Sequence, residues 1–165
     1  MNVVFFTRLY YPHIGGVEKH VQKISETLSQ KHNITIITEQ YDSSLPLVEN
    51  LSGIKIFRIP VVGVGESTKK WAIWAWLWKH WNLLDQADIL HAHDVYFWLF
   101  IYKFFRPFKK TYVTFHGWET QYPIPLKNKI IRKASELLSD GNICVGDFIA
   151  KWYDTKPTLV TYGAV

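Results

Sequence analysis

A pair of glycines near the start of the chain is the first feature whose residue type and position could do chemistry. Gly15 and Gly16 stand between an apolar run, residues 3–7, and an amphipathic one, residues 17–28. Glycine lets a ligand approach the backbone, and the N–H groups that open a helix attract anions such as phosphate. The alternative is a tight turn that needs glycine at positive φ. Neither G-x-G-x-x-G nor G-x-x-x-x-G-K-[ST] is present, which argues against a dehydrogenase and a P-loop NTPase.

Histidines follow two later apolar runs, where they could line a cleft or hold a metal. His91, His93 and Asp94 lie at the end of one run, and the two-residue spacing puts both rings on the same side of a strand. Two imidazoles and a carboxylate, with His116 as a further ligand, could bind a divalent metal. We favour cleft-lining histidines, because only His116 is placed to complete such a site. The sequence therefore predicts no bound metal.

The residues after the fifth apolar run also point to a ligand site. His116 ends this run, so it should emerge at the same edge of a sheet as Gly16 and face the predicted anion site. Gly117 allows a ligand to come close. The carboxylate of Glu119 could accept hydrogen bonds from hydroxyl groups of a sugar or an acceptor. The alternative for Glu119 is a solvated loop charge.

Four tryptophans recur at helical spacing between residues 68 and 84. Trp71, Trp74, Trp78 and Trp81 fall within an arc of about 80° and form one aromatic stripe with lysines around it. The stripe could pack into the core, or it could lie on anionic lipid as an interfacial helix. Residues 104–110 repeat the mixture of aromatic and basic side chains. We treat the four tryptophans as candidate membrane-facing residues.

The composition limits the class of protein. A chain of 165 residues with 48% hydrophobic residues can bury one substantial core, so we expect a single domain. The net charge of +5 favours anionic partners, but scattered lysines and helical aromatics argue against nucleic acid. The single cysteine, Cys144, indicates a reducing compartment and a buried strand position. We expect no signal peptide, and no run approaches the roughly 20 residues that span a bilayer.

Apolar runs and amphipathic segments alternate along the chain and define the elements that position these residues. Residues with β-branched and aromatic side chains predict strands at 3–7, 34–38, 54–59, 88–92, 111–115, 142–145 and 158–160. Helical periodicity predicts helices at 17–28, 68–84, 95–105, 126–138 and 147–153. This alternation predicts an α/β, Rossmann-like, doubly wound and mostly parallel sheet of about seven strands with helices on both faces.

Four segments, taken in order, carry a resemblance to a known family. They are YPHIGGVE (11–18), DILHAH (88–93), TFHG (114–117) and TYGAV (161–165). Together they resemble the N-terminal domain of family 4 glycosyltransferases over nearly the whole chain. The resemblance implies two Rossmann-like domains in the GT-B arrangement, with sugar transfer from a nucleotide-sugar donor and retention of configuration. It implies no cofactor, since the nucleotide-sugar is a co-substrate, and no metal at the reaction centre.

The resemblance also implies roles for individual residues. Gly15 and Gly16 would contact the donor diphosphate, and His116 would act as the catalytic residue that faces the donor sugar. Acceptor or cleft-lining roles would fall to Tyr11, His13, His93, Asp94, Gly117 and Glu119.

By the same resemblance, residues 1–165 form one acceptor-side domain, and a C-terminal nucleotide-sugar domain would come from the same or a separate chain. We expect a hexosyltransferase-like enzyme of which this chain alone is incomplete and inactive. Its acceptor would be a sugar or a lipid-linked molecule, and its location cytoplasmic, peripheral at the inner face of the membrane. Two alternatives stay open: a metal-dependent hydrolase built on His91, His93, Asp94 and His116, and a non-catalytic module that binds a membrane or a partner.

Overall fold

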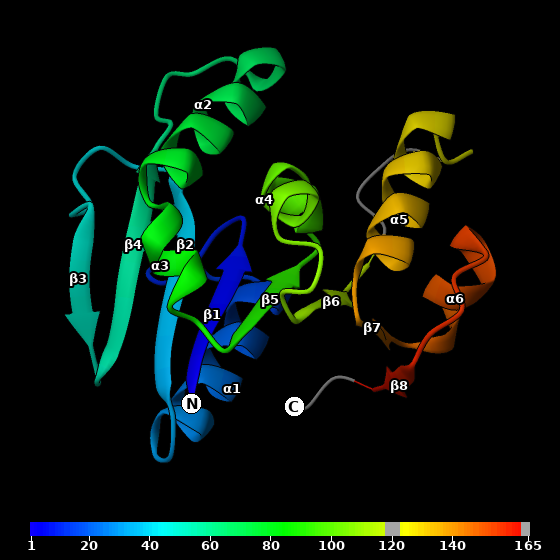
Figure 1. Cartoon of the computed structure of the whole chain (residues 1–165), viewed down its shortest axis with the longest axis horizontal. Helices are drawn as coiled ribbons and strands as arrows, with labels where there is room; N and C mark the ends of the chain where they lie inside the picture. The colour runs from blue at the N-terminus through cyan, green and yellow to red at the C-terminus, as the bar shows by residue number, and fades with distance from the viewer. Residues whose placement is uncertain (118–122, 163–165) are drawn as a thin grey trace.

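An eight-stranded sheet forms the centre of the protein in a computed structural model that describes residues 1–117 and 123–162. Its strands are β1 (Asn2–Thr7), β2 (Asn33–Gln40), β3 (Val48–Leu51), β4 (Ile54–Pro60), β5 (Ile89–His93), β6 (Thr111–Phe115), β7 (Gly141–Val145) and β8 (Leu159–Thr161). They lie in the order β3-β4-β2-β1-β5-β6-β7-β8, which runs from left to right in Figure 1. All neighbouring strands are parallel except β3 and β4.

Helices cover both faces of this sheet. They are α1 (Gly16–Ser29), α2 (Glu66–Lys79), α3 (Trp81–Asp85), the 3-10 helix η1 (Tyr96–Leu99), α4 (Phe100–Phe105), α5 (Leu126–Leu138) and α6 (Asp147–Tyr153). The apolar side of α1 packs on one face of the sheet. Residues of α2, α3, η1, α4 and α6 pack on the other face. Right-handed crossovers explain this division, since β1 connects to β2 toward one edge and later strands are added toward the other.

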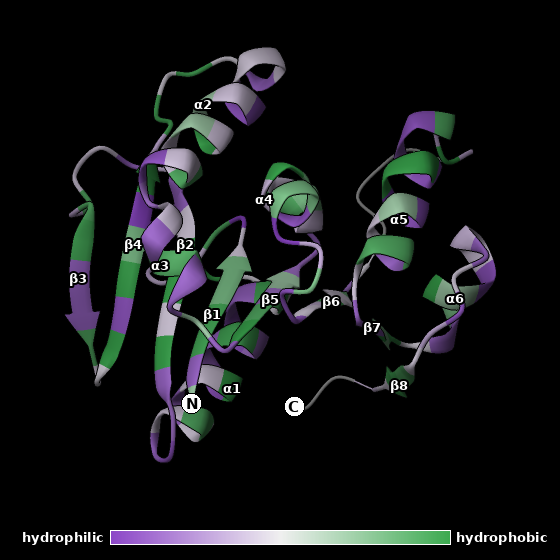
Figure 2. Cartoon of the chain, in the orientation of Figure 1, coloured by the Kyte–Doolittle hydropathy of each residue, from purple (hydrophilic) through white to green (hydrophobic). Residues whose placement is uncertain are grey.

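Strand β1 shows why the apolar runs become central strands. Every residue of β1 after Asn2 is buried, because a parallel strand is covered on both faces. Phe5 contributes to the core under α1, and Phe6 contributes to the core on the opposite face. In Figure 2, β1 is accordingly drawn mostly green beyond its first residues.

The predicted fold class is confirmed, with one strand more than expected. Residues 48–51 form β3, which pairs antiparallel with β4 at the edge of the sheet. Its sequence, VENL, contains a charged and a polar residue and is largely solvent-facing, so it gave no apolar run. Cys144 is buried in β7, as predicted.

Two predicted helices are interrupted, whereas α5 and α6 have the predicted bounds. The helix expected over 68–84 ends at His80, whose φ of −108° and ψ of 26° separate α2 from α3. The His80 ring stacks on Trp76, and its Nδ1 lies 2.8 Å from the Trp76 carbonyl oxygen. The segment over 95–105 starts as η1 before α4. Over the described residues, no helix combines the length and apolarity needed to cross a bilayer.

The register of three central strands brings the ends of the apolar runs together. Thr7 at the end of β1 pairs with His93 at the end of β5, and His93 pairs with Thr114 in β6. The segments that follow β1, β5 and β6 therefore leave the sheet side by side at its carboxyl edge, where ligands bind in such folds.

Candidate active site

The loop between β1 and α1 supplies the first part of the site. Gly15 precedes α1 in extended conformation, with φ −156° and ψ 176°, and no side chain caps the helix. Gly16 is not among the described residues with positive φ. The tight-turn alternative for this glycine pair is therefore wrong. The N–H groups of the first turn of α1 have no partner within the helix, which leaves donors for a ligand.

The two glycines have different surroundings. A Cβ at Gly15 would overlap the carboxylate of Glu18, the end of a flexible side chain that would have to move. A Cβ at Gly16 would meet no atom of the described residues within 4 Å. Among the described residues, the space beside Gly16 is therefore open to a ligand.

Two further residues of this loop, Tyr11 and His13, contact residues outside it. The Nδ1 atom of His13 lies 3.2 Å from Glu18 Oε1. The carbonyl oxygen of Tyr11 accepts a 2.9 Å hydrogen bond from Nη2 of the buried Arg58. Both predicted cleft residues, Tyr11 and His13, therefore lie in the loop that leads to Gly16.

Strand β5 presents His91 and His93 on one side, as the two-residue spacing predicted. Their rings stack with centroids 4.7 Å apart and an interplanar angle of 13°. Both rings contact Phe5 edge-on, which places them on the face covered by α1. His91 Nε2 lies 2.8 Å from Thr114 Oγ1, which joins β5 to β6.

His116 is fixed by contacts to its ring and to its backbone. His93 Nδ1 lies 2.9 Å from His116 Nε2, so one ring donates a hydrogen bond to the other. The His116 backbone N–H donates to Asp94 Oδ1 at 3.0 Å, and Asp94 has a left-handed backbone with φ 62°. Arg132 of α5 donates a 2.9 Å hydrogen bond to the carbonyl oxygen of Gly117. These contacts preorganise His116 and Gly117 at the carboxyl edge.

His20 is a member of the site that the sequence did not single out. Its ring, on the second turn of α1, makes an edge contact with His116 at 4.7 Å and with His93 at 6.0 Å. His20 lies four residues after Gly16, on the same side of the helix. Helical spacing could have shown that His20 shares a side of α1 with Gly16, but not that it contacts His116. Through His20, the structure brings the Gly16 end of α1 against His116, as the strand order predicted.

Burial keeps this histidine cluster neutral. Desolvation, followed by the nearby imidazoles of His20 and His91, lowers the pKa of His116 from 6.5 to about 3. Desolvation and His20 lower the pKa of His91 to about 4. Burial also holds the pKa of His93 well below its ordinary value. Neutral imidazoles can donate and accept hydrogen bonds, so His116 faces the edge of the sheet as a polar, uncharged group.

The same cluster is the closest approach to a metal site among the described residues. One ring nitrogen from each of His20, His93 and His116 lies within 4.8 Å of the others. Ligand nitrogens around a tetrahedral zinc are only about 3.4 Å apart, given bonds of about 2.0 Å. His91 and Asp94, predicted as ligands in the metal alternative, instead contact Thr114 and the His116 backbone. His93 Nδ1 and His116 Nε2 share a hydrogen bond at 2.9 Å, which a metal bound to both atoms would have to replace.

Other predicted residues lie outside this cluster. Glu119 lies outside the described residues. Trp71 and Trp78 are exposed on α2, whereas Trp74 and Trp81 are half-buried and contribute less surface than the stripe predicted. Trp74 Nε1 donates a 3.2 Å hydrogen bond to the carbonyl oxygen of Phe97.

Sequence comparisons match this chain to one family and to proteins of known activity. The family profile described as Glycosyltransferase Family 4 matches residues 14–157. One subunit of phosphatidylinositol N-acetylglucosaminyltransferase from Homo sapiens is 26% identical over 96 residues, which cover 56% of this chain and 20% of that protein. The GPI3 subunit of the enzyme of the same name from Saccharomyces cerevisiae is 26% identical over 95 residues, which cover 56% of this chain and 21% of that protein. The match thus spans about a fifth of the length of these relatives.

Solved structures share the fold. Sucrose-phosphate synthase from Thermosynechococcus elongatus superposes with a TM-score of 0.73 and 13% identity, over 97% of this chain and 47% of that chain. An alpha-glucosyltransferase in complex with UDP gives a TM-score of 0.51 and 14% identity, over 97% of this chain and 43% of that chain. A UGT transferase from Siraitia grosvenorii in complex with UDP gives a TM-score of 0.52 and 14% identity, over 98% of this chain and 50% of that chain. At these identities the likeness concerns the fold alone.

Proposed function

Because this chain belongs to glycosyltransferase family 4, we propose that it forms the acceptor-side half of a retaining glycosyltransferase. The observation that carries the proposal is the contact of His20, one helical turn after Gly16, with the His116 ring at 4.7 Å. A site of this kind needs an opposite wall. We propose that residues 1–165 are one domain and that a nucleotide-sugar domain, in the same or a separate chain, supplies that wall.

The donor would be a nucleotide-sugar held by its diphosphate at the start of α1. The open space beside Gly16 and the N–H groups of the first helical turn suit a phosphate oxygen. The Glu18 carboxylate lies beside Gly15, so the diphosphate would approach from the Gly16 side. Two structural neighbours of the same fold are complexes with UDP, which is compatible with a nucleotide-sugar donor and specifies neither its base nor its sugar.

His116 would face the donor sugar and stabilise positive charge as the glycosidic bond breaks. The ring is neutral and fixed by His93, and the backbone is fixed by Asp94, so its dipoles need little rearrangement during the reaction. Preorganised dipoles of this kind provide electrostatic stabilisation of a transition state. The acceptor would lie against the residues of the β1–α1 loop, including Tyr11 and His13.

We further propose a lipid-linked acceptor and a cytoplasmic location at the inner face of a membrane. The names of the two curated relatives include phosphatidylinositol, a lipid, and describe each relative as a subunit. These names support an acceptor that is itself a lipid and an assembly with further subunits. No cofactor besides the nucleotide-sugar is proposed.

Replacing Gly16 by alanine tests the proposed function. The added Cβ meets no atom of residues 1–117 or 123–162 within 4 Å, so the Gly16→Ala protein should fold with unchanged thermal stability. The methyl group would stand where the donor diphosphate is proposed to bind. We expect kcat/KM for the nucleotide-sugar to fall by about 10- to 100-fold in the protein that includes the donor domain, equivalent to about 1.4–2.7 kcal/mol.

Gly65→Ala is the control, because Gly65 lies at the start of another helix, α2, and a Cβ there would meet only Thr68 Oγ1, at 3.9 Å, among the described residues. It should leave both stability and kcat/KM unchanged. Equal activity of the Gly16→Ala and Gly65→Ala proteins would contradict the proposed donor site.

The histidine cluster supports a second candidate, a metal-dependent hydrolase. Its ligands would be His20, His93 and His116 rather than the set with His91 and Asp94. Elemental analysis of the purified protein separates the two functions. A stoichiometric metal that is lost in a His20→Ala variant would favour the hydrolase, and we expect none.

A further inference from the structure

An exposed aromatic and cationic surface lies on the face of the sheet opposite the histidine cluster. It is formed by α2, by α4 and by the turn that follows α4. We call it the aromatic-cationic face and define it by Trp71, Trp78, Phe104, Phe105 and Phe108 together with Lys70, Lys79, Arg106 and Lys110.

The aromatic side chains of this face are unusually exposed. The exposed fraction is 96% for Phe108, 80% for Phe104 and about 60% for Trp71 and Trp78. Several rings of this face contact one another, because the centroids of Trp78 and Phe105 lie 5.8 Å apart, both rings contact the half-buried Trp81, and Phe104 lies 5.2 Å from Phe105. A contiguous apolar patch of large rings on a surface marks an interaction site.

The charge of the same segments is uniformly positive. Residues 68–81 contain three lysines and residues 103–110 contain three lysines and one arginine, and neither segment contains Asp or Glu. Lys69 and Lys103 are already paired with carboxylates. Lys70, Lys79 and Lys110 are exposed, and the Lys70 ammonium lies 5.3 Å from the centroid of the Trp71 ring.

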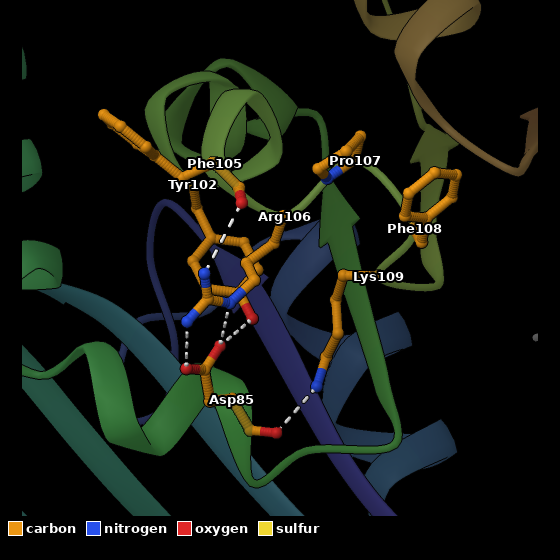
Figure 3. A pocket seen from close by; sticks show the side chains of 7 residues that line it. All are labelled: Asp85, Tyr102, Phe105, Arg106, Pro107, Phe108 and Lys109. Atoms are coloured by element: carbon orange, nitrogen blue, oxygen red, sulfur yellow. Dashed lines mark hydrogen bonds and ion pairs between the residues drawn. The ribbon is translucent and has the colours of Figure 1, made fainter.

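A hollow at the base of α4 shows how the carboxylate of Asp85 is neutralised. Figure 3 shows Phe105 and Phe108 on either side, with Arg106 between them and Asp85 below. Arg106 donates two hydrogen bonds to the Asp85 carboxylate, at 3.2 and 3.1 Å, and the Tyr102 hydroxyl donates a third at 2.7 Å. Asp85 therefore does not oppose an anionic partner.

Lys109 adds positive charge to the floor of this hollow. Its ammonium donates to the carbonyl oxygens of Asp85 and Ala87. Main-chain carbonyls orient the ammonium without cancelling its charge. The hollow thus combines aromatic walls with a cationic floor.

We propose that the aromatic-cationic face binds the surface of a membrane that contains anionic phospholipids. Amphipathic aromatic rings settle at the boundary between headgroups and acyl chains, and lysines beside them attract anionic headgroups. Phe104 and Phe108, the most exposed rings, enter this boundary, while Lys70, Lys79 and Lys110 remain at headgroup level. A second copy of the chain would bring like charges together, so charge favours lipid over self-association.

This inference extends the proposed function, since a lipid-linked acceptor would be met at a membrane, but it is tested without donor or acceptor. Gly16 and His116 lie away from this face. The Gly16→Ala protein should therefore bind vesicles like the parent, and the failure of sugar transfer and the failure of membrane binding are separate results.

Vesicle flotation of the full chain provides the test. We expect binding to vesicles of phosphatidylcholine with phosphatidylglycerol, weaker binding to phosphatidylcholine alone, and loss of binding as salt rises. Lys70→Gln and Lys110→Gln should each weaken partition about fivefold. Phe104→Ser and Phe108→Ser should each weaken it about tenfold, because less apolar surface enters the lipid.

The matched controls are Ile130→Ser with Leu137→Ser on α5, and Lys23→Gln with Lys31→Gln near α1, all of exposed residues. Each pair should leave vesicle binding unchanged. The proposal is overturned if the chain does not float with anionic vesicles, or if the control pairs weaken binding as much as the test variants. It is also overturned if the parent is a dimer that Phe104→Ser with Phe108→Ser converts to a monomer without any vesicle binding.

Discussion

At the scale of single residues, the two neighbouring glycines, Gly15 and Gly16, have different surroundings and so different roles. Gly15 leaves room for the Glu18 carboxylate, whereas Gly16 leaves room that none of the described residues fills. The sequence pattern predicted one role for both. It could not separate them, because the direction in which the Glu18 side chain folds is set by the helix start and not by the spacing of the glycines.

The neutral histidines predict a loss of stability in acid. The pKa values of about 3 for His116 and about 4 for His91 lie below the ordinary 6.5, so the unfolded chain binds protons first as the pH falls. The stabilisation is complete above about pH 6.5 and is lost as the pH falls toward the folded pKa values. Each of the two groups should lower the free energy of unfolding by about 1.4 kcal/mol per pH unit in this window.

Urea denaturation between about pH 7.5 and pH 5 measures this dependence. A His91→Asn variant should show a shallower dependence than the parent, since it removes one titrating group. A free energy of unfolding that stays constant over this range would show that the cluster is not neutral in the folded state.

At the scale of elements, the predicted bounds hold where the local pattern and the tertiary packing agree. The amphipathic periodicity of α5 and the short apolar run of α6 gave their bounds directly. Strand β3 escaped prediction, because an edge strand with one partner needs no apolar run. The break at His80 was also not predicted. The stacking of His80 on Trp76 follows from packing, and the break leaves the helical spacing of the tryptophans intact, so the sequence pattern does not reveal it.

A buried arginine joins several elements and gives a prediction at this scale. Arg58 of β4 is 1% exposed, donates to the carbonyl oxygens of Tyr11 and Pro46, and pairs with Glu49 of β3. Removal of one partner of a buried pair leaves an uncompensated charge, which costs about 3–5 kcal/mol when both groups are fully buried. Because Glu49 is partly exposed, we expect Glu49→Gln to lower the free energy of unfolding by about 2 kcal/mol.

Glu66 is the matched control, because its carboxylate pairs with Arg8 at 3.4 Å but is 75% exposed. Glu66→Gln should cost less than about 1 kcal/mol. Urea midpoints of the two variants compare the pairs directly, and equal shifts would mean that Arg58 does not brace the loop that carries Tyr11.

At the scale of the whole molecule, the alternation of strands and helices predicted where the candidate site lies more directly than any single motif did. The alternation of strands and helices predicted that Gly16, His93 and His116 would share the carboxyl edge, and the register confirms it. The contact between His20 and His116 could not be predicted in the same way. It depends on the angle at which α1 crosses the sheet, which short-range spacing does not determine.

The geometry also predicts the behaviour of the chain on its own. The proposed donor site has a single wall, made by the start of α1 and by His116. Donor contacts on one side leave most of the ligand in water, so we expect residues 1–165 alone to show no measurable transfer or hydrolysis of nucleotide-sugars. Chromatographic detection of released nucleotide over hours checks this, and robust turnover would contradict the need for a second wall.

The central position of β1 has a consequence for how the protein is made. The chain places β1 between β2, which ends at Gln40, and β5, which ends at His93. During synthesis, β1 can pair with β2 early, but its other edge waits until β5 has emerged from the ribosome. An apolar strand with an open edge is prone to pair with other chains. The interval between the emergence of β2 and that of β5 is thus the stage at which the nascent chain most needs protection by chaperones.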